Sequence, residues 1–127
     1  MEKILIDATA RTPKFDFDPD QRRLILSGES YPEDPPKFFA EPLTKVREFL
    51  KLKHEGVVHF SFQMTYFNSS SAKVIMDLFS ALEESATEGN DVLIEWHHAD
   101  DDDNMRELGE EFSEELVKAR FQLLTFT

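Results

Sequence analysis

Apolar and polar residues alternate along the first third of the chain, a pattern typical of β-strands with one buried face. The first run covers residues 4–8, the second places Phe15 and Phe17 between aspartates, and the third covers residues 23–26. Residues 18–20, Asp-Pro-Asp, favour a turn because proline presets φ and aspartate hydrogen-bonds to nearby backbone. We therefore predict three strands, of which the last two form a hairpin.

A helical spacing of apolar residues replaces this alternation after Asp34, a candidate N-cap. The apolar face of the first predicted helix comprises Phe39, Leu43, Val46 and Leu50. Pro42 lies inside this segment, and a proline there removes a backbone hydrogen bond. The sequence accordingly predicts either a kinked helix or one that begins near Ala40.

Strands and helices alternate through the rest of the chain. Further strands are predicted around residues 58–64, 92–96 and 121–124. Between them, one helix carries apolar residues 74–82, and a last helix runs from Met105 to Leu116 with an acidic first turn. The order β-β-β-α-β-α-β-α-β favours right-handed crossovers onto one mixed sheet. Residues 1–127 are thus predicted to form a single α/β domain with about three helices.

Composition narrows the functional classes. The 127 residues include no cysteine and carry a formal net charge of −12. Such an acidic field repels phosphate backbones and anionic membrane surfaces, so we expect no nucleic-acid binding. No stretch approaches the roughly 20 apolar residues needed to cross a bilayer, so we expect no membrane insertion. The N-terminus lacks the apolar block of a signal peptide. Together with the lack of disulfides, these features predict a cytoplasmic protein.

The sequence offers little for metal binding or for motif-based catalysis. No glycine-rich phosphate loop, nucleophile elbow or His-Glu-x-x-His pattern occurs. The four aspartates at residues 100–103 lack the register of a calcium loop and favour an acidic helix start. His59 has no carboxylate at ligand spacing, and the adjacent His97 and His98 point to opposite faces of a strand. We predict no metal, no cofactor and no enzyme, although 26 acidic residues leave a catalytic carboxylate pair open.

The most informative feature is the junction between a predicted strand and a predicted helix at residues 66–73. Three consecutive serines, residues 69–71, follow Asn68 where a helix start presents unpaired N–H groups and a positive dipole. Asparagine and serine are preferred N-caps, so capping alone explains one of these residues. A phosphate on a remaining hydroxyl would gain amide donors and add about 1.5–2 negative charges to the surface. The turn therefore has two interpretations, a simple cap and a phosphorylation site.

Residues 30–34 form the second segment of interest. In structural terms, these residues end a strand, form a turn and cap the first helix. These structural roles explain the residue types without any functional role. In functional terms, Tyr31 and Glu33 flank Pro32 and place an aromatic ring beside a carboxylate at the start of that helix. Such a pair would suit a docking surface.

Together these segments resemble the SiaC family of bacterial regulatory phosphoproteins. The resemblance is carried by GESYPE at residues 28–33, YFNSSSAKVIMD at residues 66–77 and ELGEEF at residues 107–112. It extends from about Thr12 to the C-terminus. It implies a fold similar to the STAS-type anti-sigma-factor antagonists, with the phosphoacceptor at a helix N-terminus after a central strand.

The resemblance also implies partner switching. A kinase of the histidine-kinase-like ATPase type phosphorylates such a protein, and a PP2C-type phosphatase reverses the modification. The unphosphorylated form binds and activates a diguanylate cyclase, which raises cyclic di-GMP and favours biofilm formation. Alignment on the family's Asn-Thr-Ser-Ser pattern places the acceptor on Ser69, with Ser70 and Ser71 as competing acceptors. Ala72 also departs from the family pattern, which often has a larger apolar residue there.

The resulting expectation is a docking face that a phosphate on Ser69 disrupts. The residues assigned to partner binding are Tyr31, Pro32, Glu33, Asn68, Ser70 and Lys73. One alternative is a small-molecule- or nucleotide-binding α/β domain that uses the same helix N-terminus, although only Lys73 supplies a cation near the turn. Another is a purely structural subunit, which predicts no dependence of binding on Ser69.

Overall fold

A computed structural model describes residues 1–126, which contain one six-stranded sheet. The strands are β1 Ile4–Ile6, β2 Lys14–Asp18, β3 Arg23–Ser30, β4 Val57–Phe67, β5 Asp91–His98 and β6 Arg120–Thr125. They lie in the sheet in the same order as in the chain. The β1–β2 and β2–β3 pairs are antiparallel, whereas β3, β4, β5 and β6 are parallel. The predicted α/β fold with a mixed sheet is confirmed.

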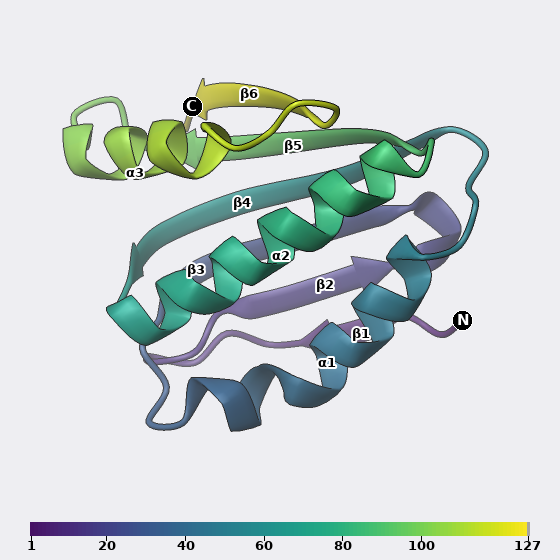
Figure 1. Ribbon diagram of the computed structural model, residues 1–127. Coiled ribbons are helices and arrows are strands. Elements are labelled where there is room, and N and C mark those ends of the chain that lie inside the picture. The colour runs from purple at the N-terminus through teal and green to yellow at the C-terminus, as the bar shows by residue number, and fades with distance from the viewer. Residues whose placement is uncertain (127) are drawn as a thin grey trace.

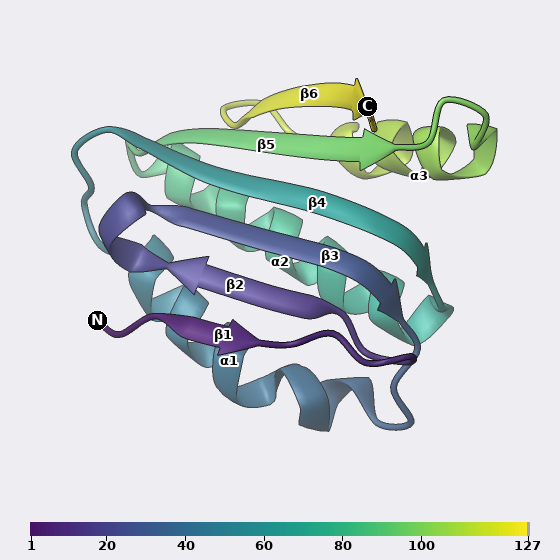
Figure 2. The same ribbon diagram turned by 180° about the vertical axis from the view of Figure 1, so that it is seen from behind.

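Each parallel connection contains one helix, and the three are α1 Pro35–Leu50, α2 Ser69–Thr87 and α3 Asp103–Ser113. Right-handed crossovers between successive neighbouring strands place such helices on one face of a sheet. Figures 1 and 2 show α1 and α2 covering the same face, with α3 beside the ends of β5 and β6. Within the described residues, the opposite face of the sheet carries no helix. None of these helices has the length and apolar character that crossing a bilayer requires.

Alternation along the strands decides which side chains enter the core. In β5, Val92, Ile94 and Trp96 are buried against the helices, whereas the residues between them point to the uncovered face. Trp96 lies at the centre of an aromatic cluster. Its ring centroid is 5.4–6.0 Å from those of Phe62, Phe67, Phe79 and Phe112. This cluster joins β4, β5, α2 and α3.

One of the two alternatives for the first helix is confirmed, and the end of the last helix differs from its prediction. The first helix begins at Pro35, and Asp34 caps it by accepting the Lys37 N–H at 3.2 Å, so the start near Ala40 does not apply. Pro42 lies inside α1, and Figure 1 shows a bend in this helix.

The last helix ends at Ser113, so Leu116 belongs to the following turn and not to the helix. The turn continues with a hydrogen bond from the Leu116 N–H to the Ser113 carbonyl at 3.0 Å.

Candidate functional site at the start of helix α2

The carboxyl ends of β3 and β4 lie side by side and meet the start of α2 (Figure 1). The Asn68 N–H donates to the Ser30 carbonyl at 3.1 Å, and this bond joins the residue after β4 to the end of β3. The hydroxyl oxygens of Ser30 and Ser71 are 2.8 Å apart and form a buried hydrogen bond. Two bonds therefore fix the first turn of α2 against the sheet. The carboxyl ends of parallel strands are where α/β proteins commonly bind their ligands.

Asn68 is the N-cap of α2. Its side-chain Oδ1 accepts the Ser71 N–H at 2.9 Å, and its backbone carbonyl accepts the Ala72 N–H at the same distance. The N–H groups of Ser69 and Ser70, at the first two helical positions, have no acceptor within the helix. Two amides at the positive end of a 19-residue helix are thus available to an anion.

The three serines occupy three different environments. Ser69 and Ser70 are exposed, whereas Ser71 is only 1% exposed and its hydroxyl is bonded to Ser30. Ser70 lines a groove between α1 and α2 together with Lys73 and Asp77. Capping and packing therefore account for Asn68 and Ser71, and leave Ser69 and Ser70 at the surface.

An aromatic pair adjoins this turn. The rings of Tyr31 and Tyr66 meet edge to face with centroids 5.8 Å apart, and Tyr66 is 50% exposed. The guanidinium carbon of Arg11 lies 5.9 Å from the Tyr31 ring centre, and Arg11 Nη1 is 3.3 Å from Glu33 Oε1. An exposed ion pair of this kind contributes at most about 1 kcal/mol to stability. Its main effect is to present an aromatic and charged surface beside the serines.

The predicted partner-binding residues divide by exposure. Glu33, Ser70 and Lys73 are exposed, whereas Tyr31 and Asn68 are half-buried. Pro32 is buried and offers little surface to a partner. Sequence reasoning missed two members of this surface, Tyr66 and Arg11.

The two missed residues differ in the signal that the sequence gives for them. An aromatic residue directly before the serine turn was a visible signal for Tyr66. Arg11 has no such signal, because only the folded chain brings it next to Tyr31.

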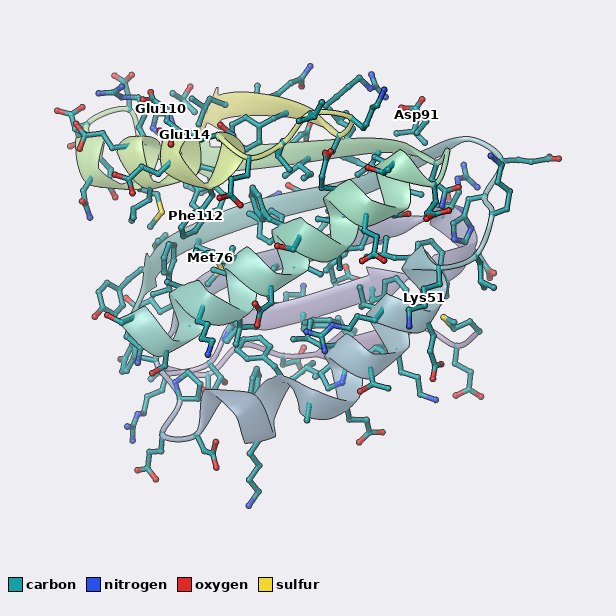
Figure 3. The ribbon with its side chains drawn as sticks, in the orientation of Figure 1. Lys51, Met76, Asp91, Glu110, Phe112 and Glu114 are labelled. Carbon is teal, nitrogen blue, oxygen red and sulfur yellow. The ribbon has the colours of Figure 1, made fainter. Side chains whose placement is uncertain are left out.

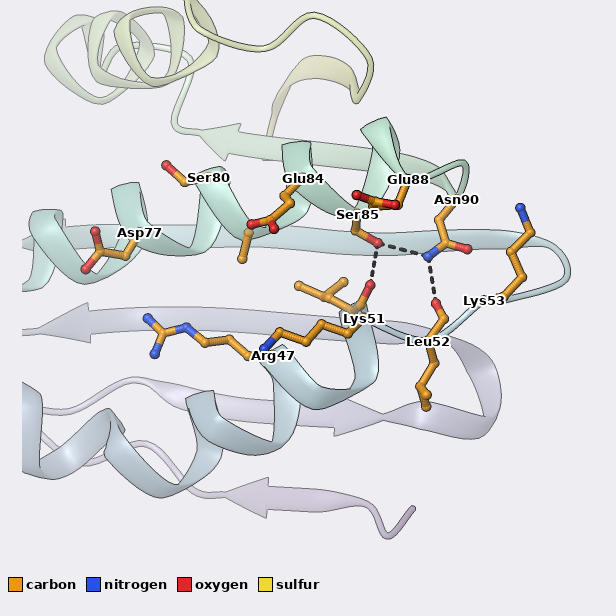
Figure 4. Close-up of a pocket in the computed structure, with 12 residues that line it drawn as sticks. Arg47, Lys51, Leu52, Lys53, Asp77, Ser80, Glu84, Ser85, Glu88 and Asn90 are labelled. Carbon is orange, nitrogen blue, oxygen red and sulfur yellow. Dashed lines mark hydrogen bonds between the residues drawn. The ribbon is translucent and has the colours of Figure 1, made fainter.

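A groove of about 700 Å³ separates the C-terminal halves of α1 and α2 (Figure 4). Its basic side chains are Arg47, Lys51 and Lys53, and its acidic ones are Asp77, Glu84 and Glu88. At one end, the Asn90 side-chain amide donates to the Leu52 carbonyl at 2.8 Å and to the Ser85 hydroxyl at 3.0 Å (Figure 4). Walls of opposite charge give this groove no preference for a phosphate-bearing ligand.

The uncovered face of the sheet brings together polar residues from different strands. His59 Nε2 lies 2.8 Å from Glu95 Oε1, and His97 Nε2 lies 3.6 Å from the same oxygen. His59 has no carboxylate at ligand spacing in the sequence, but the pairing of β4 with β5 brings Glu95 to it. His98 points to the other face and is buried. Within residues 1–126, no group of three or more His, Cys, Asp or Glu side chains is arranged to hold a metal ion.

Glu83 on α2 accepts hydrogen bonds from the backbone of the segment between α3 and β6. Its carboxylate accepts the Lys118 N–H at 3.0 Å and the Ala119 N–H at 2.9 Å. Desolvation by burial acts to raise the pKa of Glu83. The backbone N–H groups of Ala119, Lys118 and Val117, together with the Lys118 charge, outweigh it and hold the pKa below the ordinary 4.5. The Glu83 carboxylate thus supplies acceptors for backbone N–H groups in the segment between α3 and β6.

We expect Glu83→Gln to lower stability at neutral pH by at most about 1 kcal/mol, because a neutral amide oxygen replaces a charged acceptor and solvent screens the interaction. A depressed pKa stabilises the fold above the unfolded-state pKa and ceases to do so as pH falls through the folded-state pKa. The difference between variant and parent should therefore narrow below pH 4.5. Thermal unfolding of both proteins at a series of pH values measures this difference in stability. Glu84→Gln, at the exposed neighbouring position, is the control, and an equal loss in both variants would contradict this role.

Three comparisons place the chain among known proteins. The profile of the SiaC family regulatory phosphoprotein matches residues 6–126. An uncharacterised protein of Pseudomonas aeruginosa (strain UCBPP-PA14) is 32% identical over 115 residues, covering 91% of this chain and 90% of that protein.

Solved structures show the same likeness. The crystal structure of apo-SiaC from P. aeruginosa has a TM-score of 0.86 at 32% identity, and covers 98% of this chain and 99% of that one. A chain in the crystal structure of the diguanylate cyclase SiaD with its activator SiaC, also from P. aeruginosa, has a TM-score of 0.89 at 30% identity. It covers 97% of this chain and 99% of that one. The protein is thus a regulator rather than an enzyme, and it belongs to the SiaC family of regulatory phosphoproteins.

Proposed function

We propose that this protein is a partner-switching regulator controlled by phosphorylation of Ser69. A kinase of the histidine-kinase-like ATPase type adds the phosphate, and a PP2C-type phosphatase removes it. The unphosphorylated form binds and activates a diguanylate cyclase in the cytoplasm, and so raises cyclic di-GMP. One observation carries the proposal: Ser69 is an exposed hydroxyl at the first position of α2, in a chain that belongs to a family of regulatory phosphoproteins.

Exposure and hydrogen bonding favour Ser69 over its neighbours. A kinase must bring the γ-phosphate of ATP within bonding distance of the hydroxyl, and Ser71 is buried and bonded to Ser30. Ser70 is exposed but faces the groove between α1 and α2. Ser69 has neither constraint, and it is the position to which the resemblance in sequence assigns the acceptor.

The local electrostatics suit a phosphate that is held in place. The free amides of Ser69 and Ser70 can donate to phosphate oxygens at the positive end of the helix. The modification then adds about 1.5–2 negative charges next to the surface formed by Tyr31, Tyr66 and Glu33. A partner that docks on this surface meets new charge and bulk, and each 1.4 kcal/mol of lost binding energy weakens the complex about tenfold.

A solved complex supports the choice of partner. The activator SiaC from P. aeruginosa, which has the same fold, is seen with the diguanylate cyclase SiaD. Because function depends on the surface and not on the fold alone, the cyclase is an inference for this chain.

Kinase labelling tests the acceptor. When the protein is incubated with the cognate kinase and ATP, we expect tandem mass spectrometry to find one phosphate on Ser69, and Ser69→Ala to remain unlabelled. Ser70→Ala should be labelled like the parent. Labelling of Ser69→Ala at the parent level, or a phosphate mapped to Ser70, would show that the assignment is wrong.

A thermal-shift measurement distinguishes the nucleotide-binding alternative from the partner-switching proposal. It predicts that a nucleotide alone raises Tm by linkage, without any protein partner. The partner-switching proposal predicts no such rise.

A further inference from the structure

A groove of about 430 Å³ lies between α2 and the α3 segment, and it differs from the 700 Å³ groove between α1 and α2 in the residues at its base and in its charge. Its apolar residues are Met76, Phe79, Phe112 and Leu116. Met76 is 52% exposed, whereas Phe79 is buried and Phe112 is partly buried, with ring centroids 5.8 Å apart. Figure 3 labels Met76 on α2, and Phe112 and Glu114 on the α3 side of the groove. Exposed apolar surface with a polar rim is typical of a protein-binding site, and methionine adapts to many partners.

The rim of this groove is strongly acidic. Its carboxylates are Glu83, Glu84, Glu111, Glu114 and Glu115, and no lysine or arginine is among the residues that line it. The charge of Lys118, in the segment between α3 and β6, acts on Glu83. The remaining glutamates that line the groove are exposed. An excess of negative charge around an apolar floor is complementary to a segment with an apolar stripe and a basic face.

We propose that the α2–α3 groove binds a basic amphipathic segment of a partner protein. Apolar side chains of the segment contact Met76 and Phe112, and its lysines or arginines pair with the glutamates of the rim. The proposal does not depend on phosphorylation of Ser69. That residue lies at the N-terminal end of α2, about 10 Å from Met76 along the helix axis, because each residue adds a rise of about 1.5 Å.

A model peptide tests this inference on the full chain. The probe is a synthetic amphipathic helical peptide of leucine and lysine, and its counterpart replaces lysine with glutamate. We expect the basic peptide to bind at moderate salt, with amide chemical-shift changes centred on Met76 and Phe112, and the acidic peptide not to bind. The double variant Glu111→Lys with Glu115→Lys should weaken binding about tenfold or more.

A matched control separates this site from general attraction to an acidic protein. The double variant Glu41→Lys with Glu48→Lys changes the net charge equally on the exposed side of α1 and should bind the peptide like the parent. Equal weakening in both double variants, or shifts spread over the whole acidic surface, would overturn the proposal. Binding of the acidic peptide, or self-association of the protein through Met76, would also overturn it, since a different occupant would then fill the groove.

Discussion

Gly109→Val is expected to lower the free energy of unfolding by roughly 2–4 kcal/mol, because it overpacks the core and strains a buried hydrogen bond. A Cβ at position 109 would lie 2.5 Å from Trp96 Cδ1 and 2.7 Å from Trp96 Nε1. Trp96 is 1% exposed and donates its indole N–H to the Met105 carbonyl at 3.0 Å. Neither the ring nor α3 can move without opening the aromatic cluster.

Denaturant unfolding followed by the fluorescence of Trp96, the single tryptophan, measures this loss directly. The emission should also shift to longer wavelength as α3 separates from the ring. Glu107→Val introduces the same side chain on the exposed side of α3 and should cost much less. Equal stability of the Gly109 variant and its parent would mean that α3 does not pack on Trp96 as described.

Ser69→Asp is expected to abolish activation of the diguanylate cyclase, whereas Ser69→Ala should retain it. The added carboxylate places charge where the phosphate would lie, and the expected loss of affinity is about tenfold or more. Cyclic di-GMP synthesis by the purified cyclase, titrated with each variant, provides the measurement.

The comparison variant for this effect is Gln21→Asp, which adds the same charge before β3, at the other end of the sheet. It should activate the cyclase like the parent protein. Equal activation by Ser69→Asp and Ser69→Ala would contradict a switch at this position.

The sequence predicted most of the fold, because its apolar periodicities are strong and local. In β5, alternation identified Val92, Ile94 and Trp96 as core residues, and all three are buried. For α1, the sequence left two alternatives open, and the structure shows the longer helix that Asp34 caps, with Pro42 inside it. The end of α3 was missed. The Glu83 carboxylate accepts a hydrogen bond from the backbone N–H of Lys118, which lies 35 residues further along the chain, and a local sequence pattern does not reveal such a contact.

The candidate site was predicted in part. Three serines after Asn68 indicated a helix start, and Asn68 is indeed its N-cap. Their separate roles depended on the tertiary structure, because Ser71 is bonded to Ser30, 41 residues away.

Contacts between strands were likewise invisible in the sequence. The parallel register of β3 and β4 brings Ser30 beside Phe67, and that of β4 and β5 brings His59 near Glu95. Periodicity identifies the face of a strand but not its neighbour.

The affinity of the diguanylate cyclase for this protein before and after phosphorylation tests the switch most directly. Fully phosphorylated protein, made with the kinase and verified by intact mass, is compared with the unmodified protein by titration calorimetry. We expect binding to weaken by about tenfold or more on phosphorylation and to recover fully after treatment with the PP2C-type phosphatase. Equal or tighter binding by the phosphorylated protein would contradict the switch.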